Sequence, residues 1–238
     1  MSRKSALFIA QPGDTVMLLK VAGVNLPEKE IVTSLQAVFS REQDEDQEYE
    51  FNPSVLDTIH VCHGANAPET YVYLVFPTAS AYSGSPESTY TAGGGSAGAQ
   101  ASAQAIALPP LDGALKAAEI SHLTVTLVIE GASSQAVPSW HYVVETDIRP
   151  EAESDFNDWY THEHLPGLAA VPGTVRAMRL RDTEGSPRYH ALYLLETRET
   201  FESEPWLKVR GTEWSSRVRP SFTNSKRTMF SLLQIGLA

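Results

Sequence analysis

Cysteine and long apolar runs are scarce in this sequence, and their scarcity excludes several protein classes. Cys62 is the single cysteine among 238 residues, so no internal disulfide can form, which is typical of a reducing compartment. No apolar run approaches the ~20 residues that span a bilayer. The apolar stretch at residues 6–10 is also shorter than the ~7–15 residues of a secretory signal. We therefore expect a cytoplasmic protein that does not associate with membranes.

Positive charge is also in short supply. Lys and Arg total 18 against 29 Asp and Glu, which gives a net charge of −11. A chain of this charge repels phosphate backbones, so we expect no nucleic-acid partner. The deficit is uneven: residues 1–139 hold 6 basic and 15 acidic residues, whereas residues 140–238 hold 12 and 14. The 42% hydrophobic content is ordinary and allows one large or two small globular domains.

Nucleotide-binding and metal-binding motifs are missing as well. The chain has no P-loop, no G-x-G-x-x-G after a strand, no G-x-S-x-G and no H-E-x-x-H. His162 and His164 flank Glu163, but residues two apart on a helix point ~200° apart and cannot share one ion unless the helix ends there. We therefore expect no metal site and no cofactor. Cys62 lies in a predicted strand, where a buried structural thiol is favoured over a reactive one.

What remains is a regular alternation of strands and helices in the second half of the chain. Pro150 suits the first turn of a helix, and Pro166 with Gly167 predicts its end. The other predicted elements are strands at 140–148, 174–181, 188–197 and 226–236 and a helix at 204–218. The order β-α-β-β-α-β is that of a ferredoxin-like unit.

The first half gives a weaker copy of the same order. The predicted elements are strands at 15–23, 55–62, 70–77 and 121–130 and helices at 26–39 and 112–120. We expect an α+β fold of two tandem ferredoxin-like βαββαβ units, with domains at 1–135 and 136–238. The acidic run 41–50 is predicted to be a solvated loop. The Gly-, Ser- and Ala-rich residues 80–110 are predicted to be an inserted surface loop, with an active-site lid as the alternative.

The densest group of reactive side chains lies on the first helix of the second unit. Trp159, Tyr160 and His164 share a face with Phe156 at helical spacing, and this face is predicted to pack on the sheet. A histidine titrates near neutral pH, so His164 can act as a general acid or base without a cofactor. The alternative is a buried structural imidazole.

The facing strands supply further polar residues. An arginine there could hold an enolate, phenolate or carboxylate. Arg176 and Arg179 have opposite strand parity, so we expect only one of them to reach a pocket beside His164. His190 and Tyr193 also have opposite parity, and the same limit applies to them.

These residues resemble the EthD-like family of the dimeric α/β-barrel superfamily. The resemblance covers residues 140–235 and is carried by an aromatic-polar-acid-Trp-Tyr run, a Glu-His pair, a Pro-Gly turn, a basic strand and a Tyr-x-Ala-x-Tyr strand. In this chain they are Phe156, Asn157, Asp158, Trp159, Tyr160, Glu163, His164, Pro172, Gly173, Arg176, Arg179, Tyr189, Ala191 and Tyr193. The resemblance implies paired sheets that form a barrel and a pocket between sheet and helices in each unit.

The resemblance also implies a function. His164 and Tyr160 would be catalytic, with Asn157, Trp159 and the strand residues named above beside a small hydrophobic substrate. The expected activity is cofactor-independent isomerisation, decarboxylation, cyclisation or another lyase reaction, in catabolism or specialised metabolism, with cofactor-free monooxygenation also within the superfamily. The alternatives are a non-catalytic ligand-binding protein and a haem enzyme with His190 as ligand. The helix at 26–39 lacks His, Trp and Tyr, so the first unit is predicted to be a structural partner, and we expect a homodimer.

Overall fold

The computed structural model describes residues 9–39, 59–77 and 110–233. The predicted loop 41–50 and all but the last residue of the predicted insertion 80–110 lie outside these residues. Within the described ranges, no helix is long and apolar enough to cross a membrane. The first unit comprises β1 (Thr15–Ala22), α1 (Glu28–Phe39), β2 (His60–Gly64), β3 (Glu69–Phe76), the 3₁₀ turn η4 (Gly113–Leu115) and β4 (Glu119–Glu130).

The second unit has the same strand order and more helical structure. Its strands are β5 (Trp140–Ile148), β6 (Thr174–Asp182), β7 (Tyr189–Leu195) and β8 (Phe222–Leu233). Between β5 and β6 lie η5 (Pro150–Ala152), α2 (Glu153–Trp159), η6 (Tyr160–His164) and α3 (Leu165–Ala169). Between β7 and β8 lie η7 (Arg198–Thr200), α4 (Glu204–Arg210), α5 (Glu213–Val218) and η8 (Arg219–Ser221).

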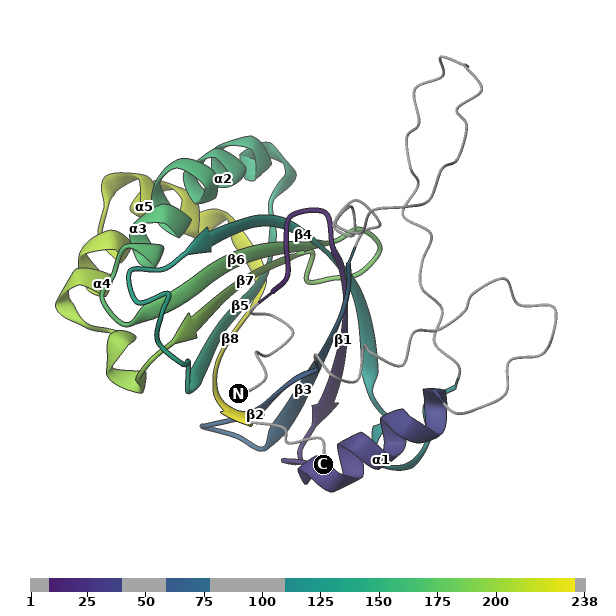
Figure 1. The fold of residues 1–238 in the computed structure, drawn as a ribbon. Helices are drawn as coiled ribbons and strands as arrows, with labels where there is room; N and C mark the ends of the chain where they lie inside the picture. Colours follow the sequence, from purple (N-terminus) through teal and green to yellow (C-terminus); the bar gives the residue numbers. More distant parts are fainter. Residues whose placement is uncertain (1–8, 40–58, 78–109, 234–238) are drawn as a thin grey trace, which may run out of the picture.

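The eight strands form one closed antiparallel barrel in the order β1-β3-β2-β8-β5-β7-β6-β4 (Figure 1). Within each unit the fourth strand lies beside the first, then the third and the second, which is the ferredoxin-like arrangement. The two sheets join where β2 pairs with β8 and where β4 pairs with β6. The expected α+β fold, with two tandem units that close one barrel, is confirmed.

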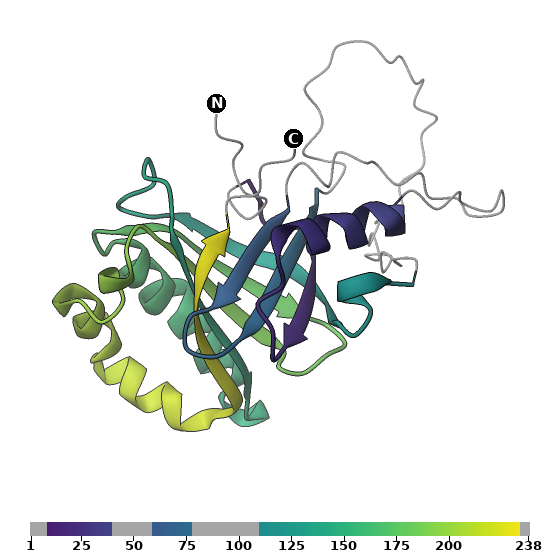
Figure 2. The same cartoon turned by 90° about the horizontal axis from the view of Figure 1, so that it is seen from below.

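Strand alternation divides the apolar side chains into three cores. One fills the barrel and includes Leu18, Tyr73 and Leu192. A second lies between the outer face of the second sheet and α2 to α5, and a third lies beneath α1 on the opposite side of the barrel (Figure 2). Cys62 is fully buried in the barrel core, which confirms the structural interpretation of this thiol, and burial raises its pKa well above the usual value.

The first unit has lost most of its second helix. The predicted helix 112–120 is wrong: a single 3₁₀ turn occupies Gly113–Leu115, and β4 begins at Glu119. Gly113 has a φ of +60°, which is outside the helical region, and Ile120 pairs with Leu19 of β1. The last two residues of the predicted helix therefore pair in the sheet as the start of β4.

Two predictions in the second unit also need correction. The predicted helix 204–218 is two short helices, because Gly211 ends α4 and the Thr212 hydroxyl caps α5 by accepting a hydrogen bond from the Ser215 amide. The last strand begins at Phe222, four residues before the predicted start at Lys226. The strand lengthens because β8 pairs with β5 as far as Ile148.

Candidate functional site

The helix that carries His164 contains a π-turn, and this turn shapes the site. The chain remains helical through Pro166 to Ala169, so the predicted end at Pro166 is wrong. The Leu165 amide donates a hydrogen bond to the carbonyl of Tyr160, five residues earlier. In an α-helix the acceptor would be the carbonyl four residues earlier. Pro166 has no amide hydrogen and its ring crowds the carbonyl four residues before it. The wider turn relieves that conflict without ending the helix.

The π-turn places His164 directly over Trp159. Their ring centroids are 4.1 Å apart with a 19° interplanar angle, a stacked pair. Residues five apart on a regular α-helix point ~140° apart and could not stack. Tyr160 meets the same imidazole edge-on, with centroids 5.3 Å apart. The stack fixes the plane of the His164 ring, and the Trp159 indole nitrogen is held in turn by Glu163 at 3.1 Å.

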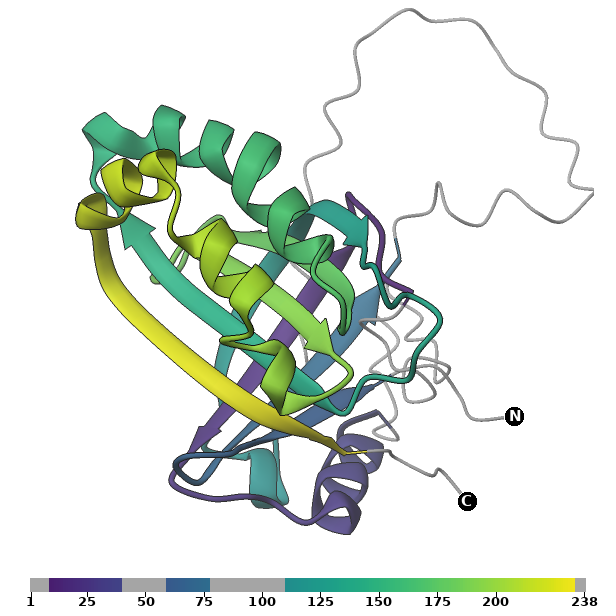
Figure 3. The ribbon, with the colours of Figure 1, turned by 90° about the vertical axis from the view of Figure 1, so that its left-hand side faces the viewer.

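A small cavity lies beside His164 and is lined by residues of the second sheet and of the helices over it. Figure 3 shows these helices on the outer face of the sheet. Its volume is about 20 Å³, which is room for little more than one water molecule. The walls are mainly aromatic, and three arginines complete them. The lining residues are Tyr142, Val144, Trp159, Tyr160, His164, Leu168, Tyr193, Trp206, Arg210, Arg219, Phe222 and Arg227.

The polar atoms of this cavity are unusually short of partners. His164 Nδ1, the Tyr193 hydroxyl and Trp206 Nε1 are buried, and none has a hydrogen-bond partner in the part of the chain that the structure describes. An unsatisfied buried polar group costs roughly 1–3 kcal/mol, so three around one cavity are expensive for folding alone. A ligand with complementary groups would recover that cost.

Burial sets the protonation of the two predicted catalytic residues. His164 is 6% exposed, and desolvation, followed by the nearby Arg219 and Arg210, holds its pKa well below the usual 6.5. Its imidazole is therefore neutral at pH 7. Burial also raises the pKa of Tyr160 to about 12, although Arg179 opposes the shift. Tyr160 is therefore a hydrogen-bond donor at neutral pH.

Arg179 lies on the helix side of the sheet but does not line the cavity. Its guanidinium stacks over Phe156, Tyr160 and Tyr189, with ring centroids 4.4 to 4.9 Å away. It also donates to Asn157 Oδ1 at 2.8 Å. Asn157 and Arg179, both predicted to bind substrate, are thus paired with each other behind Tyr160.

Arg176 and His190 lie on the other side of the sheet. The two side chains point away from the His164 cavity, as the parity argument predicts for one member of each pair. Arg176 binds Glu130 Oε1 and the Ala10 carbonyl, each at 2.6 Å. His190 lies 3.0 Å from the Pro187 carbonyl and 3.8 Å from the carboxylate of Glu145.

His190 is also the residue on which the haem alternative depends. Its side chain is 1% exposed, Nε2 lies 3.0 Å from the Pro187 carbonyl, and Nδ1, 3.8 Å from Glu145, has no hydrogen-bond partner among the described residues. His190 lines neither the His164 cavity nor the shallow pocket beside Asn66 and Arg198. These surroundings do not fit a haem ligand.

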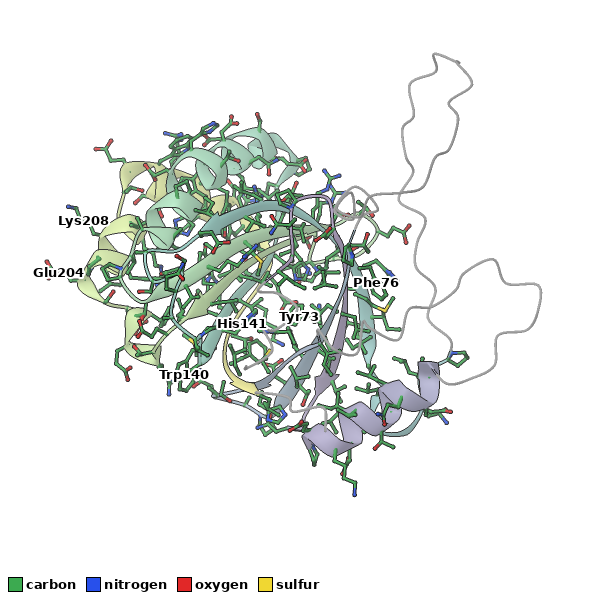
Figure 4. The ribbon with its side chains drawn as sticks, in the orientation of Figure 1. Tyr73, Phe76, Trp140, His141, Glu204 and Lys208 are labelled. Atoms are coloured by element: carbon green, nitrogen blue, oxygen red, sulfur yellow. The ribbon has the colours of Figure 1, made fainter. Side chains whose placement is uncertain are left out.

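A second polar cluster occupies the barrel interior. His60 Nε2 and His141 Nδ1 are 3.3 Å apart, and the Tyr73 hydroxyl lies 3.3 Å from His141 Nε2. Figure 4 labels Tyr73 and His141 inside the barrel. Towards the other end, Glu145 accepts a hydrogen bond from Tyr71 at 2.7 Å and pairs with Lys20 at 2.9 Å. These groups interact with one another and line neither the His164 cavity nor the pocket beside Asn66.

The sequence predictions missed several members of the site. Tyr142 falls in the predicted strand 140–148 and Trp206 in the predicted helix 204–218, and the sequence pattern predicts no role in the site for either residue. Arg210, Arg219 and Arg227 come from α4, η8 and β8, which the chain brings together only when the second unit folds. The only sequence signal for these arginines was that 12 of the 18 basic residues lie in residues 140–238.

Comparison with known proteins identifies the fold rather than an activity. No protein-family model matches this sequence, and no curated protein matches it significantly. A solved structure of a candidate monooxygenase from Fusobacterium nucleatum is similar, with a TM-score of 0.53, 8% identity and coverage of 94% of both chains. A chlorite dismutase variant from Candidatus Nitrospira defluvii has a TM-score of 0.50, 11% identity and coverage of 94% of this chain and 93% of its own.

A third similar structure is a ferredoxin-fold protein from Listeria monocytogenes related to antibiotic biosynthesis monooxygenases. Its TM-score is 0.48 at 9% identity, and the alignment covers 94% of this chain and 97% of that chain. At 8% and 11% identity, the Fusobacterium and Nitrospira structures show a shared fold and leave chemistry to the site. The chain therefore has a ferredoxin-like fold, with two units that close one barrel within a single polypeptide.

Proposed function

We propose that this protein is a cofactor-independent enzyme in which His164 moves a proton on a hydrophobic ring-containing substrate. One observation carries the proposal: a neutral, buried imidazole has its Nδ1 unpaired at the edge of a cavity with aromatic walls. Aromatic walls with a few convergent polar groups are typical of small-molecule sites. The EthD-like sequence pattern around His164 supports the same assignment.

The shared first step is abstraction of a proton from a carbon next to a carbonyl group. The C–H proton passes to His164 Nδ1, the electron pair of that bond forms a carbon–carbon double bond, and the π pair of the carbonyl group moves to its oxygen, which gives an enolate. Tyr160, which stays protonated, can donate a hydrogen bond within the same cavity. Return of the proton to another atom completes an isomerisation, and loss of a leaving group completes an elimination.

The surroundings of His164 favour this role over a purely structural one. Three histidines, His122, His164 and His190, have a buried Nδ1 without a hydrogen-bond partner among the described residues, and of these only His164 lines the aromatic cavity. Its plane is held by the Trp159 stack rather than by a hydrogen bond to that nitrogen. The low pKa makes the His164 imidazole a weak base. A negative charge that develops beside the imidazole would raise that pKa.

Proton exchange tests the proposal without knowledge of the physiological substrate. We expect the wild-type protein to accelerate deuterium incorporation into the carbon acid 2-tetralone in D₂O, followed by NMR. His164→Gln should lose about 100-fold or more of that acceleration, the lower end of general-base effects. His162→Gln is the matched control, because His162 is exposed and bonds only to the Asp158 carbonyl in the described structure.

Circular dichroism of both variants keeps a loss of folding separate from a loss of chemistry. A folded His164→Gln variant that exchanges as fast as wild type would refute the proposed role of His164. A wild-type protein that binds 2-tetralone without accelerating exchange would instead favour the non-catalytic ligand-binding alternative and would also contradict the proposal.

A further inference from the structure

We infer that the His164 cavity contains an oxyanion subsite, formed by Arg210, Arg219 and Arg227, for a ligand that carries its negative charge on a flat apolar ring. This inference rests on the proposed function only for the location of the site, and it names the class of ligand. The three arginines come from three different elements of the second unit and converge on one cavity.

The positive charges of the three arginines have no acidic partner among the described residues of the cavity wall. No acidic residue lines the cavity, and none of the three arginines makes an ion pair in the described part of the chain, whereas nearby Arg217 pairs with Asp155 at 2.8 Å. The whole chain carries a net charge of −11, so carboxylates are plentiful elsewhere. Three unpaired guanidinium groups beside one another repel, and a bound anion would relieve this repulsion.

The mutual repulsion is visible at Arg219. Burial lowers the pKa of this half-buried guanidinium, and the charges of Arg210 and Arg227 lower it further. Arg219 and Arg210 also help to depress the pKa of His164. All of these groups would be stabilised by one negative charge in the cavity, which would also strengthen His164 as a base.

Three other residues that line the cavity carry a buried polar atom without a hydrogen-bond partner among the described residues. His164 Nδ1, the Tyr193 hydroxyl and Trp206 Nε1 are all at least nine-tenths buried and have no partner among the described residues. The hydroxyl and the indole nitrogen are donors, as guanidinium groups are. A site rich in donors and lined by aromatic rings matches an oxyanion attached to a planar apolar skeleton.

The present cavity is smaller than such a ligand. About 20 Å³ admits roughly a water molecule, so a ring can enter only if side chains move. Arg227 is exposed and Arg210 and Arg219 are half-buried, and no described ion pair anchors them. Rotamer changes of unanchored arginines at the rim are therefore the expected response to ligand entry.

Binding of matched probes tests the inference. We would titrate the protein with 2-naphthoate, 2-naphthyl phosphate and the neutral 2-naphthamide, and follow binding by calorimetry. We expect at least one anion to bind about tenfold more tightly than the amide, because hydrogen bonds to a charged group are stronger than those to a neutral group. The more tightly bound anion identifies the headgroup as carboxylate or phosphate.

Arginine variants locate the subsite. Arg219→Gln should weaken anion binding about tenfold and leave amide binding unchanged, and Arg227→Gln should have a smaller effect because Arg227 is exposed. Arg181→Gln removes the same charge from an exposed position outside the cavity and serves as the control. Equal binding of anions and amide, or equal effects of Arg219→Gln and Arg181→Gln, would overturn the inference.

Anion selectivity and proton exchange are measured separately, so the oxyanion subsite and the proposed enzyme can fail independently. His164→Gln should lose about 100-fold or more of the proton exchange, whereas Arg219→Gln should lose the preference for the anion over the amide. Anion selectivity without any proton exchange would support the oxyanion subsite and refute the enzyme. Proton exchange of 2-tetralone by a protein that shows no anion preference would support the enzyme and refute the subsite.

Discussion

The buried imidazole of His60 predicts a specific loss of stability in mild acid. His60 is 2% exposed inside the barrel, 3.3 Å from His141, and burial lowers its pKa from 6.5 to about 3. Below pH 6.5 the His60 imidazole is protonated in the unfolded chain but stays neutral in the folded protein. The folded state therefore loses stability as the pH falls through 6.5, and the loss continues down to about pH 3.

The size of the loss follows from the two pKa values. Between pH 7 and pH 5, a histidine with an unfolded pKa of 6.5 and any folded pKa below about 4 destabilises the fold by about 2 kcal/mol. This interval lies above the usual carboxylate pKa values, so Asp and Glu contribute little to the change. The result therefore depends on burial rather than on the precise pKa of His60.

Urea unfolding at pH 7 and pH 5 measures this effect. His60→Gln keeps a polar group beside His141 but cannot titrate, so its unfolding free energy should fall by about 2 kcal/mol less than that of wild type over the same interval. His162→Gln, at an exposed position, should retain the wild-type dependence. If His60→Gln and wild type lose the same stability between these pH values, the imidazole is not held neutral in the barrel and the reasoning fails.

Two further stability predictions come from the barrel and from a turn. Lys20→Met should lower the unfolding free energy by about 3–5 kcal/mol, because it leaves the carboxylate of Glu145, 2% exposed, without its cation; an unchanged urea midpoint would contradict this. Gly173→Ala should cost more than Gly23→Ala in the same assay. Both glycines have positive φ, but a Cβ at Gly173 would lie 2.1 Å from the Thr200 hydroxyl, whereas Gly23 faces open space; equal costs would show that the clash is relieved.

The candidate site shows where reasoning from sequence succeeded and where it could not. The spacing of Phe156, Tyr160 and His164 predicted a helix face against the sheet, and strand parity separated Arg179 from Arg176 and Tyr193 from His190. Neither arginine lines the His164 cavity, whereas one of them was expected to reach it. The stack of Trp159 on His164 was beyond prediction, because it requires a π-turn. Local sequence rules assign Pro166 to a helix end, but the π-turn continues the helix, with Leu165 and Leu168 packed in the core.

The sequence by itself determined the two βαββαβ units, since alternation of apolar residues over eight strands depends on local spacing. The reduced second helix of the first unit was not determined, because strand pairing of Ile120 outweighed a weak helical spacing. The tertiary structure alone decided that Arg210, Arg219 and Arg227 meet beside His164. Charges on separate elements carry no signal of their proximity in sequence, and they become neighbours only when α4, η8 and β8 pack around one cavity.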